Sequence, residues 1–138
     1  MITIAQAGVL AFRIDSTGQM RVLLITSRKR GRWTIPKGVI GLRLDARETA
    51  RIEAHEEAGV SGKLSKKPLG TYEFRKWAAT CRVQMYALHV TTQETEWPER
   101  RLRRRKWFRP LEALDVITRK SLRRVVKKAL PLIAQAGS

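Results

Sequence analysis

A helix predicted over residues 45–58, DARETARIEAHEEA, is the feature that most restricts how this chain can fold. Asp45 is a residue type that accepts hydrogen bonds from a first helical turn, and Glu48 three residues later completes the pattern of a capping box. No Pro or Gly interrupts the segment, and Gly59 follows where glycine commonly ends a helix. The sequence therefore predicts one helix whose two ends are defined locally.

The same helix carries three neighbouring carboxylates, Glu53, Glu56 and Glu57. Spacings of three and four residues place them on one face, where like charges repel and raise one another's pKa. One interpretation is an exposed face whose glutamates pair loosely with nearby Arg and Lys. The other is a site for a hard cation such as Mg²⁺, which binds carboxylate oxygens together with substrate phosphates.

Positive charge dominates the rest of the chain. The 29 Lys and Arg residues exceed the 12 Asp and Glu residues, so that the formal net charge is +17. A surface of this kind attracts polyanions, but charge alone does not distinguish nucleic acid, a membrane surface or a small phosphorylated molecule. The predicted loop 28–38, RKRGRWTIPKG, concentrates positive charge immediately before the acidic helix.

Strand-forming patterns lie on both sides of the helix. Residues 8–14 and 20–27 are apolar runs separated by turn formers, which predicts a hairpin. Strands mixed with helices around one core predict an α/β or α+β layered sandwich, and the length suits one domain. The other predicted elements are strands at 69–76, 81–90 and 106–110, a loop at 91–105, and a helix at 111–130 that is broken near Thr118.

Features of the termini and of single residues favour an ordinary intracellular domain. The single cysteine, Cys81, suits a reducing compartment and is expected to be a buried thiol. The N-terminus lacks the pattern of a signal peptide, and no apolar run approaches the roughly 20 residues of a membrane span. We therefore expect a soluble cytoplasmic protein without a membrane partner.

The segment from Gly38 to Val60, GVIGLRLDARETARIEAHEEAGV, resembles the Nudix box, in which a glycine is followed at fixed spacing by glutamates and a closing Gly-aliphatic pair. Two positions depart from the consensus, since Leu44 replaces a glutamate and Ile52 replaces an arginine. We interpret their joint loss as a salt bridge exchanged for an apolar contact; the alternative is loss of catalytic tuning. The positions in register are Gly38, Glu53, Glu56, Glu57, Gly59 and Val60.

Segments outside the box extend the resemblance. GRWTIPKG, YALHV and EWPERRLRRRKWF are similar to the diphosphoinositol-polyphosphate and dinucleoside-polyphosphate branch of Nudix hydrolases. The resemblance implies one domain over 1–138 with the Nudix-type α/β/α sandwich and its mixed central sheet. It also implies hydrolysis of a diphosphate linked to a further group.

The resemblance implies a site centred on the box. Mg²⁺ or Mn²⁺ would be held by Glu53, Glu56 and Glu57, with the Gly38 carbonyl as a further ligand. Glu53 and Glu57 are the catalytic candidates, and Glu53 is the first choice of general base. The more distant candidates for a base or extra ligand are Glu96 and Glu99, whose alternative role is as solvated loop acids.

Basic residues near the box are candidates for phosphate binding, since Arg offers paired donors and Lys a point charge. His55 and His89 are expected to be neither ligands nor catalysts. Trp33 and Trp77 are expected to pack in the core or at the rim instead of stacking on a base. The candidate substrate-binding residues are Arg28, Arg30, Arg32, Lys37 and Arg75.

Three functions follow from these patterns. The first is a metal-dependent pyrophosphohydrolase of a small polyphosphorylated substrate, with diadenosine polyphosphate or diphosphoinositol polyphosphate favoured. The second removes pyrophosphate from the 5′ end of RNA, with RRLRRRK at 100–106 following the backbone; this run equally suits a solubilising loop. The third is a non-catalytic Nudix-fold binding or regulatory module. The oligomeric state and the number of metals stay open.

Overall fold

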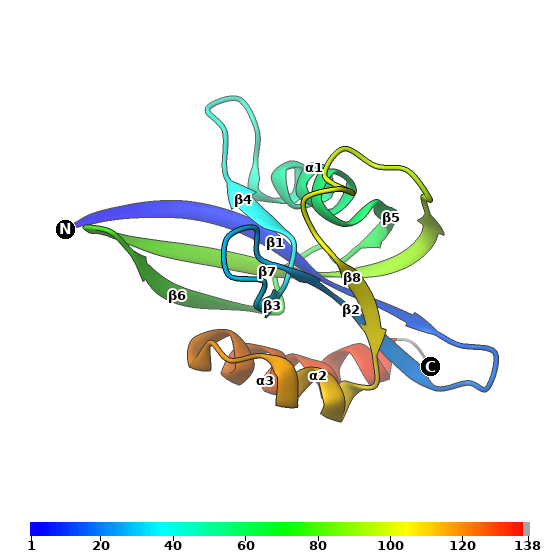
Figure 1. The fold of residues 1–138 in the computed structure, drawn as a ribbon. Helices are drawn as coiled ribbons and strands as arrows, with labels where there is room; N and C mark the ends of the chain where they lie inside the picture. Colours follow the sequence, from blue (N-terminus) through cyan, green and yellow to red (C-terminus); the bar gives the residue numbers. More distant parts are fainter. Residues whose placement is uncertain (137–138) are drawn as a thin grey trace.

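The computed structural model describes residues 1–136, which fold around one eight-stranded mixed sheet (Figure 1). The strand order is β3-β2-β1-β7-β5, while β4 pairs with β1, β6 with β7 and β8 with β2. The strands are β1 (Ile2–Ile14), β2 (Met20–Thr26), β3 (Trp33–Thr34), β4 (Lys37–Val39), β5 (Val60–Leu64), β6 (Gly70–Lys76), β7 (Ala79–Gln93) and β8 (Arg105–Phe108).

The centre of the sheet is the parallel pairing of β1 with β7, which runs from Ile2 opposite Ala79 to Phe12 opposite His89. The other strand pairs are antiparallel. The middle of β1 is buried as a continuous run from Gln6 to Phe12. A strand covered on both faces needs such a run, because neither set of its alternating side chains reaches water.

Helices cover both faces of this sheet (Figure 1). One face packs against α1 (Ala46–Ala58) and the other against α2 (Pro110–Val116) and α3 (Lys120–Ala136). Two separate apolar cores result. The α1 core includes Ala50, Ala54 and Ala58, and the α3 core includes Leu122, Val126 and Ile133. This arrangement confirms the predicted α/β sandwich with a mixed sheet.

Local residues define both ends of α1, as predicted. The Asp45 side chain accepts a 2.8 Å hydrogen bond from the Glu48 amide. At the other end Gly59 has φ 66° and ψ 33°, a left-handed conformation in which its amide donates to the carbonyls of Ala54 and His55. Glycine suits this position because it has no Cβ to clash. The box glutamates are thereby fixed relative to β4 and β5.

Several other predicted elements are confirmed with shifted ends. The hairpin is formed by β1 and β2, with Ile14 opposite Met20, and the break near Thr118 separates α2 from α3. Cys81 is a buried free thiol. Across residues 1–136, no helix has both the length and the apolar character needed to cross a bilayer. Three strands, β3, β4 and β5, were not predicted.

Candidate active site at the acidic helix

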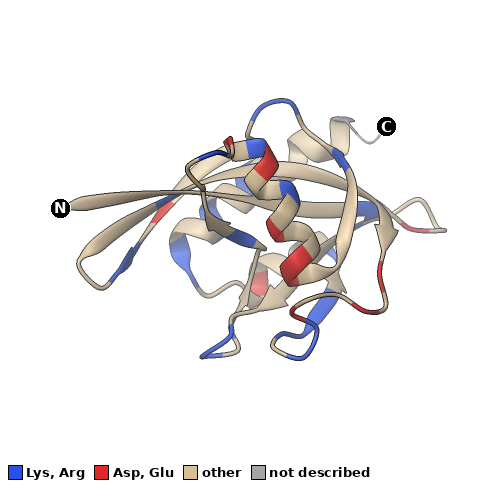
Figure 2. Ribbon diagram, turned by 90° about the horizontal axis from the view of Figure 1, so that it is seen from above, with Lys and Arg blue, Asp and Glu red and all other residues tan. Residues whose placement is uncertain are grey.

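The acidic cluster lies where α1 meets β4 and the loop that follows β7. Figure 2 shows acidic segments on α1 and on this loop among more numerous basic ones. Glu57 is buried, Glu53 is half-buried and Glu56 is exposed. A Cβ added at Gly38 would overlap the Glu53 carboxylate, so glycine in β4 permits this close approach. The first residue of the box thus touches Glu53, the first of its three clustered glutamates.

Glu57 is held from two sides. Its Oε1 accepts a hydrogen bond of 3.1 Å from the backbone amide of Lys37 on β4. Its Oε2 pairs at 3.1 Å with Nη2 of Arg103, and the two side chains are only 9% and 11% exposed. A carboxylate bonded at both oxygens has little rotational freedom, so the side chain of Glu57 has one defined orientation.

Arg103 connects the helix to the loop between β7 and β8. Its Nε pairs with Oε1 of Glu99 at 3.0 Å, and its Nη1 donates to the carbonyl of Thr26 at 3.2 Å. The planar guanidinium presents several donors in fixed directions and can serve three acceptors at once. Glu99 therefore joins the acidic cluster through Arg103. Glu96 does not, since it is 78% exposed and pairs with Arg100.

The same loop donates hydrogen bonds to the C-terminal end of α1, where carbonyl groups lack partners within the helix. The Glu99 amide donates to the Glu56 carbonyl, and the Trp97 indole donates to the Glu57 carbonyl at 3.2 Å. Arg105 donates to the Ala58 carbonyl at 2.8 Å and stacks over Trp97. Two arginines of the basic run are thus committed to internal contacts.

Burial and crowding set the protonation of the cluster. Burial raises the pKa of Glu57 to about 7, although Arg103 and the Lys37 amide oppose the shift. Burial also raises the pKa of Glu53, and repulsion from Glu56 and Glu99 adds to it. Glu57 and Arg103 act in the opposite direction on Glu53 and lower its pKa, but burial remains the largest effect. The cluster therefore favours any added positive charge.

This raised pKa predicts a pH-dependent stability in metal-free buffer. The unfolded glutamate ionises near 4.5, whereas folded Glu57 keeps its proton to about 7, so the folded state binds more protons in this window. The free energy of unfolding should therefore fall as pH rises through it, by roughly 3 kcal/mol. Urea denaturation between pH 4.5 and 7.5 measures the slope. The Glu57→Gln variant should lose this pH dependence and the Glu96→Gln variant should retain it. An unchanged slope in Glu57→Gln would show that another group causes the pH dependence.

A basic cleft of about 900 Å³ opens beside Glu57. The predicted substrate-binding residues all line this cleft, and their role as ligands stays a prediction. Among residues 1–136, Glu57 is the single carboxylate that lines the cleft. The basic residues are Arg28, Lys29, Arg30, Arg32, Lys37, Arg75, Lys76, Arg103 and Arg119.

The aromatic ring of Phe74 organises part of the cleft wall. The Lys37 ammonium lies 4.8 Å from the ring centroid and the Arg119 guanidinium lies 4.4 Å from it. Burial lowers the pKa of Lys37, against the attraction of Glu57. Burial removes water from these two cations. A phosphate bound beside them would stabilise their charge in place of that water.

Other predicted residues lie apart from this chemistry. His55 is exposed, and His89 is also exposed although its ring stacks on Phe12 with the ring centroids 4.9 Å apart. Leu44 and Ile52 are 37% and 40% exposed, and an apolar contact between them stays a prediction. Arg103 and Arg119 were missed, because nothing in their sequence surroundings distinguishes them from neighbouring arginines.

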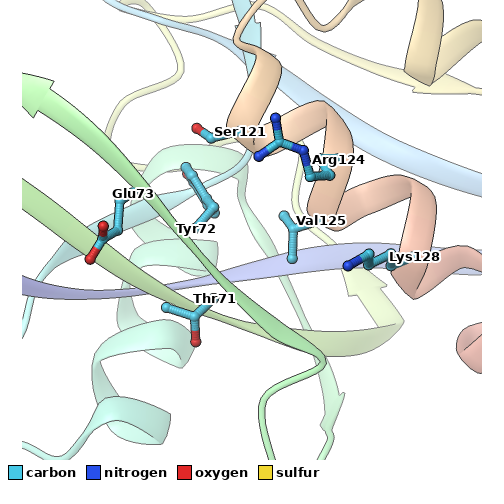
Figure 3. A pocket seen from close by; sticks show the side chains of 7 residues that line it. All are labelled: Thr71, Tyr72, Glu73, Ser121, Arg124, Val125 and Lys128. Carbon is cyan, nitrogen blue, oxygen red and sulfur yellow. The ribbon is translucent and has the colours of Figure 1, made fainter.

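A second hollow, of about 340 Å³, lies between β6 and α3 (Figure 3). Arg124 and Lys128 on α3 line it, together with Glu73, which pairs with Arg82 at 2.7 Å. No box glutamate reaches it. We therefore place the candidate active site at the larger cleft.

The acidic cluster beside the larger cleft, of which Glu57 lines the cleft itself, fits a divalent cation by its chemistry. Glu53, Glu56 and Glu57 offer hard oxygen donors. Because Glu53 lies against Gly38, the backbone of Gly38 is also close to these donors. Within residues 1–136, no three His, Cys, Asp or Glu side chains form a ready-made metal cluster, and Arg103 lies between Glu57 and Glu99. Binding would therefore involve rearrangement of these side chains.

Comparison with known proteins gives matches along most of the chain. The sequence model of the NUDIX domain matches residues 5–131. Nudix hydrolase 12, mitochondrial, of Arabidopsis thaliana is 35% identical over 125 residues, which cover 85% of this chain. Diphosphoinositol polyphosphate phosphohydrolase 3-alpha of Homo sapiens is 32% identical over 114 residues, covering 81% of this chain and 68% of that protein. The match spans 62% of the length of Nudix hydrolase 12, less than two thirds.

Solved structures share the fold. The crystal structure of the C. elegans Ap4A hydrolase has a TM-score of 0.73 at 18% identity, covering 96% of this chain and 99% of that one. The NUDIX domain of Shewanella oneidensis NrtR, solved with ADP ribose, has a TM-score of 0.77 at 16% identity, covering 96% and 90%. At such low identity the likeness establishes the architecture and no more.

Proposed function

This chain belongs to the Nudix family, and on that premise we propose that it is a metal-dependent pyrophosphohydrolase of a small polyphosphorylated substrate. One observation carries the proposal: Glu57, the buried member of the acidic cluster, also lines the basic cleft. A diphosphate bound between the acidic cluster and the basic cleft would have carboxylates on one side and cations on the other. Such a junction suits phosphoryl transfer, in which catalysis consists mainly of positioning and charge stabilisation.

The proposed roles follow from the contacts of each side chain. A divalent ion held by Glu53, Glu56, Glu57 and the Gly38 carbonyl would neutralise phosphoryl oxygens and lower the pKa of the attacking water. Glu53 is the proposed base, because donors already occupy both oxygens of Glu57. Burial raises the pKa of Glu53, which makes its carboxylate a stronger base than an exposed glutamate. Lys37 and the cleft arginines would bind the remaining phosphates.

Two substrates are favoured, a diadenosine polyphosphate and a diphosphoinositol polyphosphate. Both carry several phosphates, and the cleft has nine basic side chains for one carboxylate. Similarity to the human phosphohydrolase supports the second, and the shared fold with the Ap4A hydrolase is compatible with the first. RNA is less favoured, since Arg103 and Arg105 of the basic run are engaged within the protein.

A substrate panel tests this proposal. Diadenosine tetraphosphate, diphosphoinositol pentakisphosphate and 5′-triphosphorylated RNA would each be incubated with the protein and Mg²⁺, and products measured by chromatography. We expect turnover of at least one small substrate that stops when EDTA is added. Turnover of RNA alone, with a steep decrease as salt rises, would indicate a backbone-binding enzyme instead. No turnover of any member would favour the non-catalytic module.

A further inference from the structure

Trp77 is an aromatic side chain in an unusual place. It is 87% exposed, yet it lines the same cleft as Glu57 and the cleft arginines. The ammonium of Lys76 lies 5.2 Å from its ring centroid, which leaves most of the ring surface open to water. A Trp in this position contributes little apolar burial to folding. The sequence alone favoured a packing role for it, and this exposure reverses that preference.

The backbone at Trp77 also departs from what its side chain favours. Lys76 pairs with Ala79 across the β6–β7 hairpin, so Trp77 and Ala78 form a two-residue turn. Trp77 has φ 55° and is the only non-glycine residue with positive φ among residues 1–136. Positive φ at the first central position alone is the pattern of a type II′ turn, which prefers glycine there. A bulky residue in this region is an outlier that needs a reason.

These two features point to the same explanation. A Trp that is exposed and conformationally disfavoured stabilises the folded state less than glycine would, and such residues concentrate at functional sites. Its neighbours Arg75 and Lys76 line the cleft too, so a ligand with its phosphates there would place its organic group within reach of this hairpin.

We propose that Trp77 is a specificity-determining residue that stacks on the base of a nucleoside polyphosphate whose phosphates occupy the basic cleft. The inference rests on the proposed function and selects the nucleotide class within it. A nucleobase offers a flat π face to an exposed indole, whereas an inositol ring is saturated and offers none. One ring and a cleft of about 900 Å³ fit a single small ligand better than a continuous strand.

Equilibrium binding without metal tests this inference apart from turnover. ATP and inorganic tripolyphosphate carry the same number of phosphates, and only ATP has a base. Isothermal titration with EDTA present would compare wild-type protein, Trp77→Gly and Trp77→Phe. We expect Trp77→Gly to weaken ATP binding roughly 5- to 150-fold and to leave tripolyphosphate within about twofold. Trp77→Phe should retain most of the ATP affinity.

The glycine variant separates this role from a structural one. Since the turn prefers glycine, Trp77→Gly should melt at the same or a higher temperature. With Mg²⁺, the variant should have a higher KM for diadenosine tetraphosphate and an unchanged kcat. For diphosphoinositol pentakisphosphate, both KM and kcat should be unchanged. If wild-type protein hydrolyses neither compound, the proposed activity fails while the ATP comparison still decides the stacking. Equal weakening of ATP and tripolyphosphate, no change in either, or a larger loss for 5′-triphosphorylated RNA than for ATP would overturn the inference.

Discussion

Replacing Glu57 by Gln is expected to lower kcat by about 10²- to 10⁴-fold, the range typical of losing an acid–base or ligand group. The amide keeps the shape of the side chain and can still accept from the Lys37 amide, so its orientation should survive. It lacks the negative charge that binds a cation. The variant should fold at least as well at neutral pH, because burial disfavours the charge that is removed.

Kinetics with the substrate found in the panel measure this effect. Glu56→Gln should also lose activity, since Glu56 belongs to the proposed metal set. Glu96→Gln is the matched control, because Glu96 lies on the exposed part of the loop, where it pairs with Arg100. Activity of Glu57→Gln within about threefold of wild type would remove the box carboxylates from the mechanism.

Replacing Arg103 by Met is expected to lower the free energy of unfolding by about 3–5 kcal/mol at pH 8. The change keeps much of the apolar stem and removes the only guanidinium bonded to Glu57 among residues 1–136. Glu57 is then left as an uncompensated buried charge, and Glu99 and the Thr26 carbonyl also lose a donor. The loss should shrink at pH 5.5, where Glu57 is protonated and needs no partner.

Arg100→Met provides the matched control for this prediction. It removes an arginine from the same loop and a pair of the same i, i+4 spacing, but one that is largely exposed. Exposed pairs of this kind contribute only about 0.2–1 kcal/mol. Urea denaturation of both variants at the two pH values gives the comparison. Equal small losses would show that Arg103 is a surface residue in solution.

The sequence predicts those parts of the fold that are fixed locally. The α1 helix was predicted with nearly its observed ends because Asp45 and Gly59 define them without tertiary contacts. The strand β5 was missed because VSGKL contains little apolar sequence and pairs with β7 around an irregularity at Ser61 and Gly62. Its existence depends on the long partner strand and not on its own residues.

The site divides in the same way. The spacing of the glutamates along one helix is a local property, so the acidic cluster could be identified from the sequence. The basic residues at 28–37 could be identified because they adjoin the box. Arg103 could not be singled out, because it lies 46 residues from Glu57 in the sequence. The two residues meet only when the loop between β7 and β8 folds over the end of α1. Trp77 required a backbone angle to distinguish it from a packed aromatic.

The most direct test of the central claim is a crystal structure of the protein soaked with Mn²⁺, using anomalous scattering to locate the ion. We predict a manganese ion bonded to oxygens of Glu53, Glu56 and Glu57 at the mouth of the basic cleft. The account would be contradicted by electron density that shows these three side chains ordered and turned to solvent, with no anomalous peak next to any of them.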